Sequence, residues 1–277
     1  MFSILSRRSL LRLASLLFPV GGLGLGVRAF GFELGDEKNA PNQGPVNDLF
    51  PTQPPELARE MVTVAHYDLK RVRELVEARP SLARAAWDWG FGDWETALGG
   101  ASHMGNRPIA EYLISKGARP SLFSAAMLGE LDVVKAFVAG QPGVQRIRGP
   151  HSISLLAHAR AGGEAARPVL EYLQSLGDAD ADPPVPLSDG YADMMAGTYI
   201  FGPAMNQQIE VTVDHGQVIW ARKGMMGRQL FHVGGHAFYP AGAPAARIRF
   251  TEEGTSVLMT VSDPEVVLMA RRKQGSK

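Results

Sequence analysis

The sequence of 277 residues contains no cysteine. This absence excludes disulfide bonds, thiolate nucleophiles, iron–sulfur clusters and zinc sites built from cysteine, so any catalysis would depend on oxygen or imidazole groups. The chain also has no excess of either charge, with 28 basic and 28 acidic residues. It therefore lacks the basic balance of a nucleic-acid-binding protein, and we expect no nucleic-acid partner. What is present, 45% hydrophobic and 20% charged residues, is an ordinary globular composition.

Residues 1–29 are basic and apolar. Arg7 and Arg8 are followed by two leucines and Arg12, and an apolar, glycine-bearing run extends over residues 13–27 without an acidic residue. This segment resembles a bacterial twin-arginine signal peptide. The resemblance implies a periplasmic or otherwise exported protein, cleaved after the first 29 residues, with no membrane span in the mature chain. An uncleaved membrane anchor and a chance pair of arginines before an apolar stretch are the alternatives, and the run is short for a membrane-spanning helix.

Two stretches have the composition of linkers. Residues 30–55 carry prolines and glycines among polar residues and show no helical or strand periodicity. Residues 179–191 begin with alternating alanine and aspartate and continue into a pair of prolines. We therefore predict two domains, one over residues 56–178 and one over residues 192–273.

The first predicted domain contains internal repeats. The pentapeptide Ala-Arg-Pro-Ser-Leu at 78–82 recurs at 118–122, and Glu-Tyr-Leu-x-Ser-x-Gly at 111–117 recurs at 171–177. Apolar residues recur at helical spacing on both sides of short polar or glycine-containing turns, so each repeat is expected to form two short helices. The four predicted helix pairs lie at 56–79, 96–118, 123–138 and 152–177.

Several of these features resemble ankyrin repeats. They are the Ala-Ala-x-x-Gly pattern at 125–129, the valine pair Val133 and Val134 on the second helix, and Gly117-Ala118 at the loop. The resemblance implies an ankyrin-like α-solenoid whose concave face binds a protein or peptide partner. The uneven spacing of the turn glycines implies loops of different lengths between the units.

The second predicted domain has the period of two that is typical of β-strands. Ile209, Val211 and Val213 alternate with polar residues, and Asp-His-Gly at 214–216 then predicts a hairpin turn. Further strands are expected at 197–201, 229–233, 236–239, 246–250, 256–261 and 266–271. So many short strands predict a small antiparallel β-barrel or curled sheet, and the fold class is an α+β multidomain protein.

Short phrases in this part resemble the small β-barrel that accompanies some serine β-lactamase-like hydrolases. They are Gly-Thr-Tyr at 197–199 and His-Ala-Phe-Tyr-Pro at 236–240. In that family the barrel is an accessory domain, and the Ser-x-x-Lys motif of the catalytic domain is absent from this chain. The resemblance therefore implies no active site here. A barrel that holds a small apolar ligand is one alternative function.

Residues 87–95 contain three of the four tryptophans, mixed with glycine and acidic residues. A loop so rich in aromatic side chains is suited to recognition, because tryptophan combines a large contact area with an N–H donor. The alternative is that the rings fold back and cap the first helices. The predicted partner-binding residues are Trp87, Asp88, Trp89, Phe91, Trp94, His103 and His151.

The seven histidines are the candidates for chemistry. His103, His151 and His158 are placed to converge on one face of the repeats, where imidazoles bind zinc or act as acid and base. However, the sequence contains no His-Glu-x-x-His or His-x-His pattern and no acidic residue at a ligand-like spacing. We therefore predict structural roles for these three, with no catalytic residue, no metal and no cofactor. The other four are predicted to be surface or barrel residues: His66, His215, His232 and His236.

Together these patterns predict an exported, non-catalytic module that binds a protein or peptide through the concave face and the tryptophan-rich loop. The enzyme alternative is a periplasmic hydrolase that uses His103, His151 and His158 with or without a metal. The identity of the partner is not encoded in any of these motifs.

Overall fold

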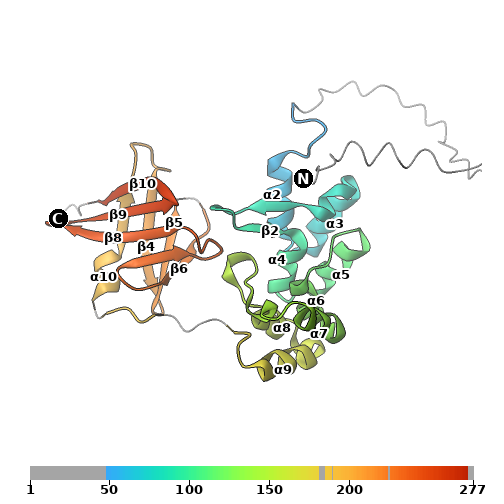
Figure 1. Cartoon of the computed structure of the whole chain (residues 1–277). Helices are drawn as coiled ribbons and strands as arrows, with labels where there is room; N and C mark the ends of the chain where they lie inside the picture. Colours follow the sequence, from blue (N-terminus) through green and yellow to red (C-terminus); the bar gives the residue numbers. More distant parts are fainter. Residues whose placement is uncertain (1–47, 181–184, 189, 224, 274–277) are drawn as a thin grey trace, which may run out of the picture. The chain divides into compact units, whose positions relative to one another are not determined.

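The computed structural model describes residues 48–180, 185–188, 190–223 and 225–273 (Figure 1). Within these residues the protein has a mixed α+β fold, in which helices come first and a closed β-barrel follows. The predicted signal peptide at 1–29 and most of the predicted linker at 30–55 lie outside the described residues.

Paired α-helices make up the first part of the described chain, as the repeat pattern predicts. Each pair joins two short helices through a turn of two to five residues. Short 3-10 helices lie between some of the pairs, and one forms the turn of the last pair. The pairs are α2 (Pro55–Val64) with α3 (Leu69–Ala78), α4 (Ala97–His103) with α5 (Arg107–Ser115), α6 (Leu122–Leu128) with α7 (Leu131–Gly140), and α8 (Leu155–Ala161) with α9 (Arg167–Leu176). The 3-10 helices are η1 (Pro80–Arg84), η2 (Val144–Arg146), η3 (Pro150–Ser152) and η4 (Gly163–Ala166).

Local side-chain bonds fix where the helices begin. Thr96 accepts a hydrogen bond from the backbone N–H of Gly99 at the start of α4, and Ser121 does the same for Ser124 at the start of α6. Such caps satisfy backbone donors that have no partner within the helix. At the end of α6, Gly129 adopts φ 81°, and a Cβ atom there would lie 2.1 Å from the carbonyl oxygen of Ala165. Glycine is therefore required both for the turn and for close packing against the next unit.

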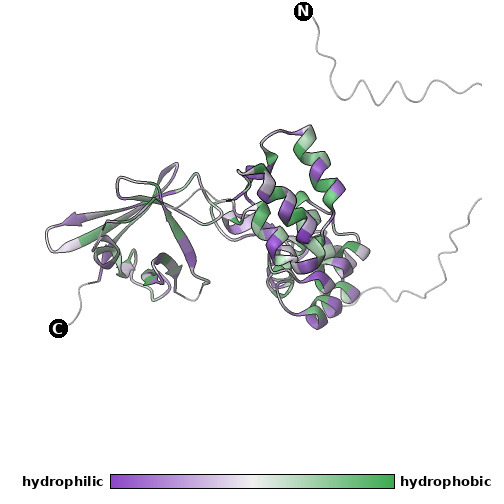
Figure 2. Cartoon of the chain, turned by 90° about the horizontal axis from the view of Figure 1, so that it is seen from below, coloured by the Kyte–Doolittle hydropathy of each residue, from purple (hydrophilic) through white to green (hydrophobic). Residues whose placement is uncertain are grey.

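Two apolar cores hold the helices together. One lies among α2 to α5 and includes Met61, Leu98 and Leu113, all of them buried. The other lies among α6 to α9 and includes Leu155 and Leu173, also buried. Figure 2 shows hydrophobic and hydrophilic residues on different faces of the same helices, the arrangement expected for an amphipathic repeat.

The tryptophan-rich segment forms a short β-hairpin rather than a loop. Strands β1 (Ala86–Asp88) and β2 (Trp94–Thr96) are antiparallel, and Trp87 lies opposite Glu95. Trp87 and Trp89 pack against the first core, as the capping alternative predicts. Trp94 instead remains 64% exposed.

The barrel has eight antiparallel strands in the closed order β10-β3-β4-β5-β6-β7-β8-β9. This confirms the predicted antiparallel β-barrel. A short helix, α10 (Tyr191–Met195), precedes it. The strands are β3 (Gly197–Ile200), β4 (Gln208–Asp214), β5 (Gln217–Arg222), β6 (Arg228–His232), β7 (Ala237–Pro240), β8 (Arg247–Glu253), β9 (Ser256–Asp263) and β10 (Glu265–Arg272).

Side chains alternate between the inside and the outside of this barrel. Along β9, Val257, Met259 and Val261 are buried while the residues between them are partly exposed, and they meet Phe238 in the barrel core. The predicted hairpin turn at 214–216 joins β4 to β5 with Asp214 opposite Gln217. Closure of the sheet leaves no long unpaired edge strand, which limits edge-to-edge association.

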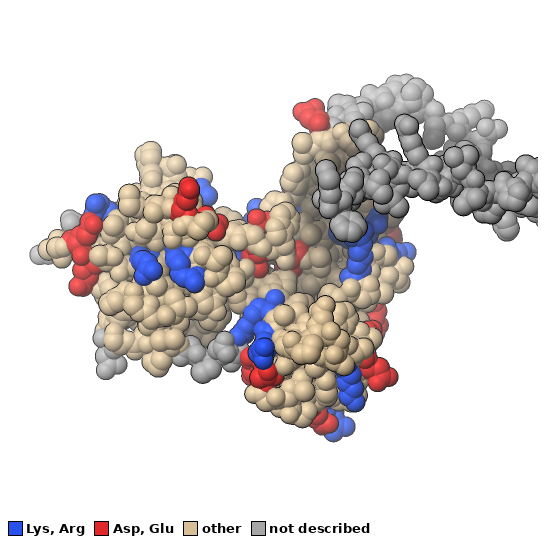
Figure 3. Space-filling view, viewed as in Figure 1, with Lys and Arg blue, Asp and Glu red and all other residues tan. Residues whose placement is uncertain are grey.

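The surface carries charges of both signs. On the face drawn in Figure 3, lysine and arginine are scattered among aspartate and glutamate. Among the described residues, no helix combines the length and apolar character needed to cross a membrane.

Candidate metal centre

Four polar side chains converge at one point in the helical part. Each offers one potential ligand atom, and these atoms all lie within 4.8 Å of one another. The set contains three imidazoles and one carboxylate, which is a common donor set for zinc and related transition metals. The four residues are His66, Glu95, His103 and His151.

Each residue comes from a different local structure. His66 lies in the turn between α2 and α3, and Glu95 is the central residue of β2. His103 is the last residue of α4, and His151 lies in the 3-10 helix η3. Folding of both the hairpin and the helix pairs is therefore needed to assemble the set.

The distances between donor atoms suit one small ion. A tetrahedral site with bonds of about 2.1 Å places its ligand atoms roughly 3.4 Å apart. Nε2 of His103 lies 3.1 Å from Nε2 of His66 and 2.9 Å from Oε1 of Glu95. Oε2 of Glu95 lies 3.5 Å from Nε2 of His66 and 3.4 Å from Nε2 of His151. These four separations, which involve both oxygens of Glu95, lie close to the tetrahedral value, and all the ligand atoms of the set lie within 4.8 Å of one another.

Hydrogen bonds on the far side of the rings orient two of the imidazoles. Nδ1 of His66 lies 2.9 Å from the carbonyl oxygen of Val62, so it donates its proton there and leaves Nε2 with a free lone pair. Nδ1 of His151 lies 2.9 Å from Oδ2 of Asp93. A carboxylate or carbonyl behind the ring is the usual support of a metal-bound histidine.

Glu95 is buried and is held by a tryptophan. The indole N–H of Trp89 donates to Oε2 of Glu95 at 2.7 Å. Glu95 itself is fully buried within the cluster. A buried carboxylate requires compensating donors or a cation, and the imidazoles and the indole supply donors here.

Asp93 holds His151 in an uncommon backbone conformation. The φ angle of His151 is 58°, in the left-handed region that non-glycine residues seldom adopt. The backbone N–H of His151 donates to Oδ1 of Asp93 at 3.0 Å, while the ring bonds to Oδ2. Arg228 also donates to Oδ2 of Asp93. Observed strain of this kind is concentrated at functional sites, because surrounding contacts must maintain it.

Three groups of the cluster have pKa values that differ from their ordinary values. Burial alone would raise the pKa of Glu95, but hydrogen bonds from His103 and His151 outweigh it and lower that pKa to about 2. Burial disfavours a charged His151, but its bonds to Asp93 and Glu95 raise its pKa to about 9. Burial lowers the pKa of His66 below its ordinary value. In the metal-free protein, Glu95 and His151 thus form a buried ion pair beside a neutral His66.

Close packing brings α4 against the His66 ring. A Cβ atom on Gly100 would lie only 2.7 Å from Cε1 of His66. The small residues of α4 therefore serve the site, because a larger side chain at position 100 would displace the imidazole.

A further histidine, His158, lies close to this set but outside it. Its ring centroid is 6.4 Å from that of His103, and its Nδ1 lies 2.9 Å from the carbonyl oxygen of Ser154. Nε2 of His158 is buried, and within the part of the chain that the structure describes it has no hydrogen-bond partner. Burial lowers the pKa of His158 to about 4, so the ring is neutral near pH 7.

The structure brings together part of what the sequence predicts. His103, His151 and His158 do converge, as expected. The expectation that His66 is a surface or barrel residue is wrong, because the residue is partly buried inside the cluster. Glu95 was missed as a candidate ligand, although it stands only eight residues before His103 and next to the predicted recognition residue Trp94.

The predicted partner-binding residues divide into two groups. His103, His151 and Trp89 belong to the cluster or support it. Asp88 caps the hairpin turn through the N–H of Gly90, and Phe91 stacks on Trp220 of the barrel. Trp94 is the member with the most exposed ring.

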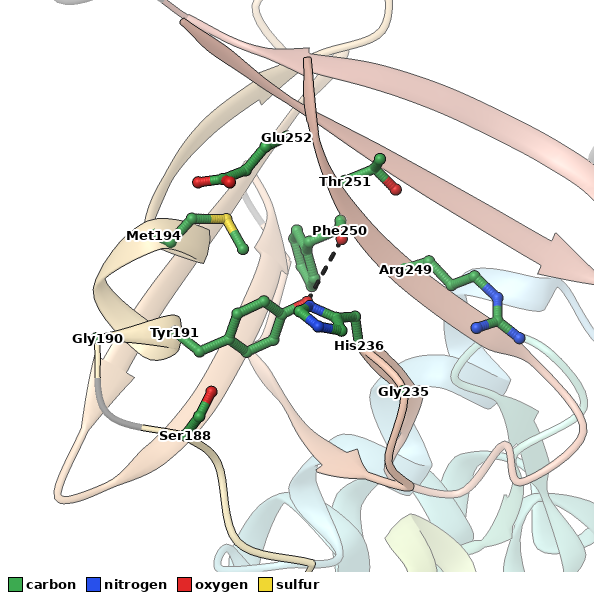
Figure 4. Close-up of a pocket in the computed structure, with 10 residues that line it drawn as sticks. All are labelled: Ser188, Gly190, Tyr191, Met194, Gly235, His236, Arg249, Phe250, Thr251 and Glu252. Carbon is green, nitrogen blue, oxygen red and sulfur yellow. Dashed lines mark hydrogen bonds between the residues drawn. The ribbon is translucent and has the colours of Figure 1, made fainter. Parts of the chain in front are cut away.

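A separate pocket of about 580 Å³ lies beside α10 and β8 (Figure 4). The ring of Tyr191 meets that of His236 edge to face at 4.4 Å, and its hydroxyl donates to the carbonyl oxygen of Phe250. Arg249 and Glu252 lie on the same strand at the margin of this pocket in Figure 4. His236 is thus a barrel residue, as predicted, and takes no part in the metal-ligand set.

Fold and site together define an α+β protein in which paired helices precede a closed β-barrel and three histidines and one carboxylate form a cluster. No protein-family model matches the chain, and the search of curated proteins finds no significant match.

Proposed function

We propose that this protein binds one divalent transition-metal ion of the zinc class and that the ion has a structural role. The observation that carries the proposal is the convergence of three Nε2 atoms and a carboxylate oxygen within 4.8 Å. A metal ion would replace the buried ion pair with four coordinate bonds. It would also connect the hairpin, two helix pairs and η3 at one point, so binding energy would contribute directly to folding.

Four protein ligands favour a structural ion over a catalytic one. Catalytic zinc keeps a position open for water or substrate, whereas structural zinc is closed by protein groups. Here Trp89 orients the Glu95 carboxylate, whose Oε1 faces His103 and whose Oε2 faces His66 and His151. The hydrolase alternative requires one of the four groups to leave the ion.

Metal analysis of untagged protein tests the proposal. We expect one zinc ion per chain, retained through gel filtration and lost with Glu95→Gln or His66→Gln. The matched control is His215→Ala, because His215 is an exposed histidine outside the cluster. Folding of each variant is checked by far-UV circular dichroism and urea unfolding. Wild-type protein that binds no zinc, cobalt or nickel at micromolar concentration would refute the proposal.

Substitution with Co²⁺ distinguishes the two roles. A closed four-coordinate site gives intense visible absorption that added azide leaves unchanged. Weak absorption that shifts with azide would show an open position and would favour the hydrolase alternative.

We further propose, from the sequence patterns, that the chain is exported by a twin-arginine signal and that its helix pairs form an ankyrin-like array. The four helix pairs and their tight turns support the second part. Fusion of residues 1–29 to a reporter that is active only after export would test the first part.

Binding of a protein or peptide partner is a second candidate function, and the exposed ring of Trp94 favours it. The ring stands on the strand that also carries Glu95, so the metal centre would hold the recognition strand rigid. Trp94→Ala should abolish partner binding while leaving metal content and unfolding unchanged. Trp87→Ala should instead lower stability, because Trp87 packs on the first core.

A further inference from the structure

We propose that one end of the β-barrel binds an apolar carboxylic acid. The barrel interior ends there in a cavity of about 420 Å³, within the usual range for small-molecule sites. The proposal concerns a second site, at the barrel end, whose lining shares Trp89 and Arg228 with the surroundings of the metal centre.

Cross-strand register places Trp220 and Arg222 on the inner face of the sheet, with Arg222 exposed at the last position of β5. Residues directly opposite each other in an antiparallel pair project from the same face of the sheet. Arg222 lies opposite Ile209, which is buried in the barrel core, and Trp220 lies opposite the buried Val211. Arg222 and Trp220 therefore belong to the inner face, with Arg222 nearer the end of β5.

The cavity lining is apolar except for a few donors. Aromatic rings and methionines predominate, and no acidic residue lies among the lining residues. The lining from the barrel and its loops includes Phe201, Ile209, Trp220, Arg222, Arg228 and Leu268. Residues 89–91 of the β1–β2 turn complete it, and Phe91 stacks on Trp220 with ring centroids 6.2 Å apart.

One donor in this lining has no acceptor. The indole nitrogen of Trp220 is buried, and no hydrogen-bond partner for it exists among the described residues. Leaving a buried N–H unsatisfied is unfavourable, so such a group can mark a water or ligand position. Because this nitrogen has almost no accessible surface, an acceptor oxygen of a ligand would reach it only after a shift of the ring or its neighbours.

The charge of the lining selects an anionic head group. Arg228 is paired with Asp93, so its charge is already balanced. Arg222 donates its Nε–H to the carbonyl oxygen of Asn206 and lies over the Phe201 ring, but no described carboxylate pairs with it. A carboxylate ligand would thus find an unbalanced guanidinium beside an apolar cavity, next to the Trp220 ring.

Exposed apolar side chains at the same end are suited to the body of the ligand. Met225, Met226 and Val267 line the cavity and remain largely exposed. Methionine adapts to ligands of different shape because it is unbranched and flexible. An aliphatic chain or an aromatic ring would cover this surface.

Three probes with the same ten-carbon chain test the proposal by isothermal titration and by NMR of the Trp220 indole N–H. They are decanoate, decanol and decyltrimethylammonium. We expect decanoate to bind at least about tenfold more tightly than decanol, because charge-assisted bonds are the stronger ones. The cationic probe should bind most weakly, and decanoate should shift the indole resonance.

Two variants locate the head group. Arg222→Gln should weaken decanoate binding at least about fivefold and leave decanol binding unchanged, while Trp220→Phe should weaken decanoate binding by a similar factor. Lys223→Gln is the matched control, because Lys223 neighbours Arg222 but does not line the cavity. If Trp220→Phe lowers the stability of the protein, the effect of Arg222→Gln on decanoate binding alone decides whether the carboxylate binds at this position. Equal affinity for decanoate and decanol, equal loss with Lys223→Gln, or no decanoate binding at millimolar concentration would overturn the proposal.

Discussion

The imidazole of His151 is joined to the carboxylate of Asp93, with 2.9 Å between Nδ1 and Oδ2. The two residues are 58 positions apart in the chain. Asp93 stands immediately before β2, and His151 lies in η3 near the start of the fourth helix pair. The contact therefore links the tryptophan hairpin to a distant unit and directs Nε2 of His151 toward Glu95. It is the best-defined supporting interaction of the candidate metal centre.

Weakening this support should weaken metal binding. Asp93→Asn keeps the size of the side chain but removes its charge, and we expect the affinity for Zn²⁺ to fall by roughly 10–100-fold. Competition with a chromophoric chelator measures the change. Asp132→Asn, at an exposed aspartate of α7, is the control and should leave the affinity unchanged. An unchanged affinity in Asp93→Asn would contradict the supporting role of the Asp93 carboxylate behind His151.

The indole of Trp89 should contribute to the centre through its N–H. Trp89→Phe retains most of the ring packing but removes the donor to Glu95, so zinc affinity is expected to fall by about tenfold. Trp94→Phe is the matched control from the same hairpin, since Trp94 is mostly exposed and directly precedes Glu95 in the chain. The same chelator competition provides the measurement. Equal effects of the two substitutions would contradict the assigned role of Trp89.

Metal binding should release about one proton per chain at pH 7.5. In the metal-free protein the pKa of His151 is raised to about 9, so its ring is protonated at that pH. Coordination through Nε2 requires the neutral ring, and the proton must leave. Calorimetric titration with Zn²⁺ in two buffers of different ionisation enthalpy gives the number of protons, which should fall as the pH rises through 9. Zero release at pH 7.5 would be incompatible with coordination by His151.

The metal-free protein should lose stability between pH 6.5 and pH 4. The pKa of His158 is about 4 in the folded state and 6.5 when unfolded, so the unfolded chain binds more protons in this window. The stabilisation is complete above pH 6.5 and is lost as the pH falls toward 4, at a cost of up to about 3 kcal/mol. The lowered pKa of His66 acts in the same direction.

Urea unfolding in a chelator at pH 7 and pH 4.5 measures this loss. His158→Leu should reduce the difference between the two pH values, whereas His215→Gln, at an exposed histidine, should not. The pKa of Glu95 is lowered to about 2, so Glu95 affects the stability only below pH 4.5. It therefore does not contribute to the difference between pH 7 and pH 4.5. A pH dependence that is unchanged in His158→Leu would show that other groups are responsible.

Alanine substitutions at two turn glycines distinguish the cost of backbone strain from the cost of a packing clash. Gly117 and Gly129 have φ angles of 89° and 81°, so alanine is strained at both. Only at Gly129 would the new Cβ meet a neighbour, the carbonyl oxygen of Ala165 at 2.1 Å. We expect Gly117→Ala to cost about 1 kcal/mol and Gly129→Ala at least about 2 kcal/mol more. Chemical denaturation measures both, and equal costs would contradict the packing at Gly129.

Much of the fold follows from local patterns. The helix pairs were predictable because apolar residues recur every three or four positions between turn residues, as in the helix that ends before Gly117. The strand that begins at Ser256 was predictable from the alternation of Val257, Met259 and Val261. Each of these signals is contained within about ten consecutive residues, so no long-range contact is needed to recognise it.

The hairpin was harder to recognise. Trp87 and Trp89 occur in a run of aromatic, acidic and glycine residues that has neither helical nor strand periodicity over a useful length. Its strands have only three residues each, and their pairing depends on the turn at residues 89–93 and on packing against the first core. The sequence therefore predicted an aromatic-rich segment but not which rings are buried.

The sequence by itself determined a cysteine-free chain with paired helices, a β-barrel and three histidines placed to converge. The tertiary structure alone decided that His66 joins them and that Glu95 supplies the carboxylate. The physical reason is that ligand geometry depends on the three-dimensional position of side chains a few ångströms apart. Residues 66, 95, 103 and 151 meet only after the hairpin pairs and the helices pack, and neither event leaves a fixed spacing in the sequence.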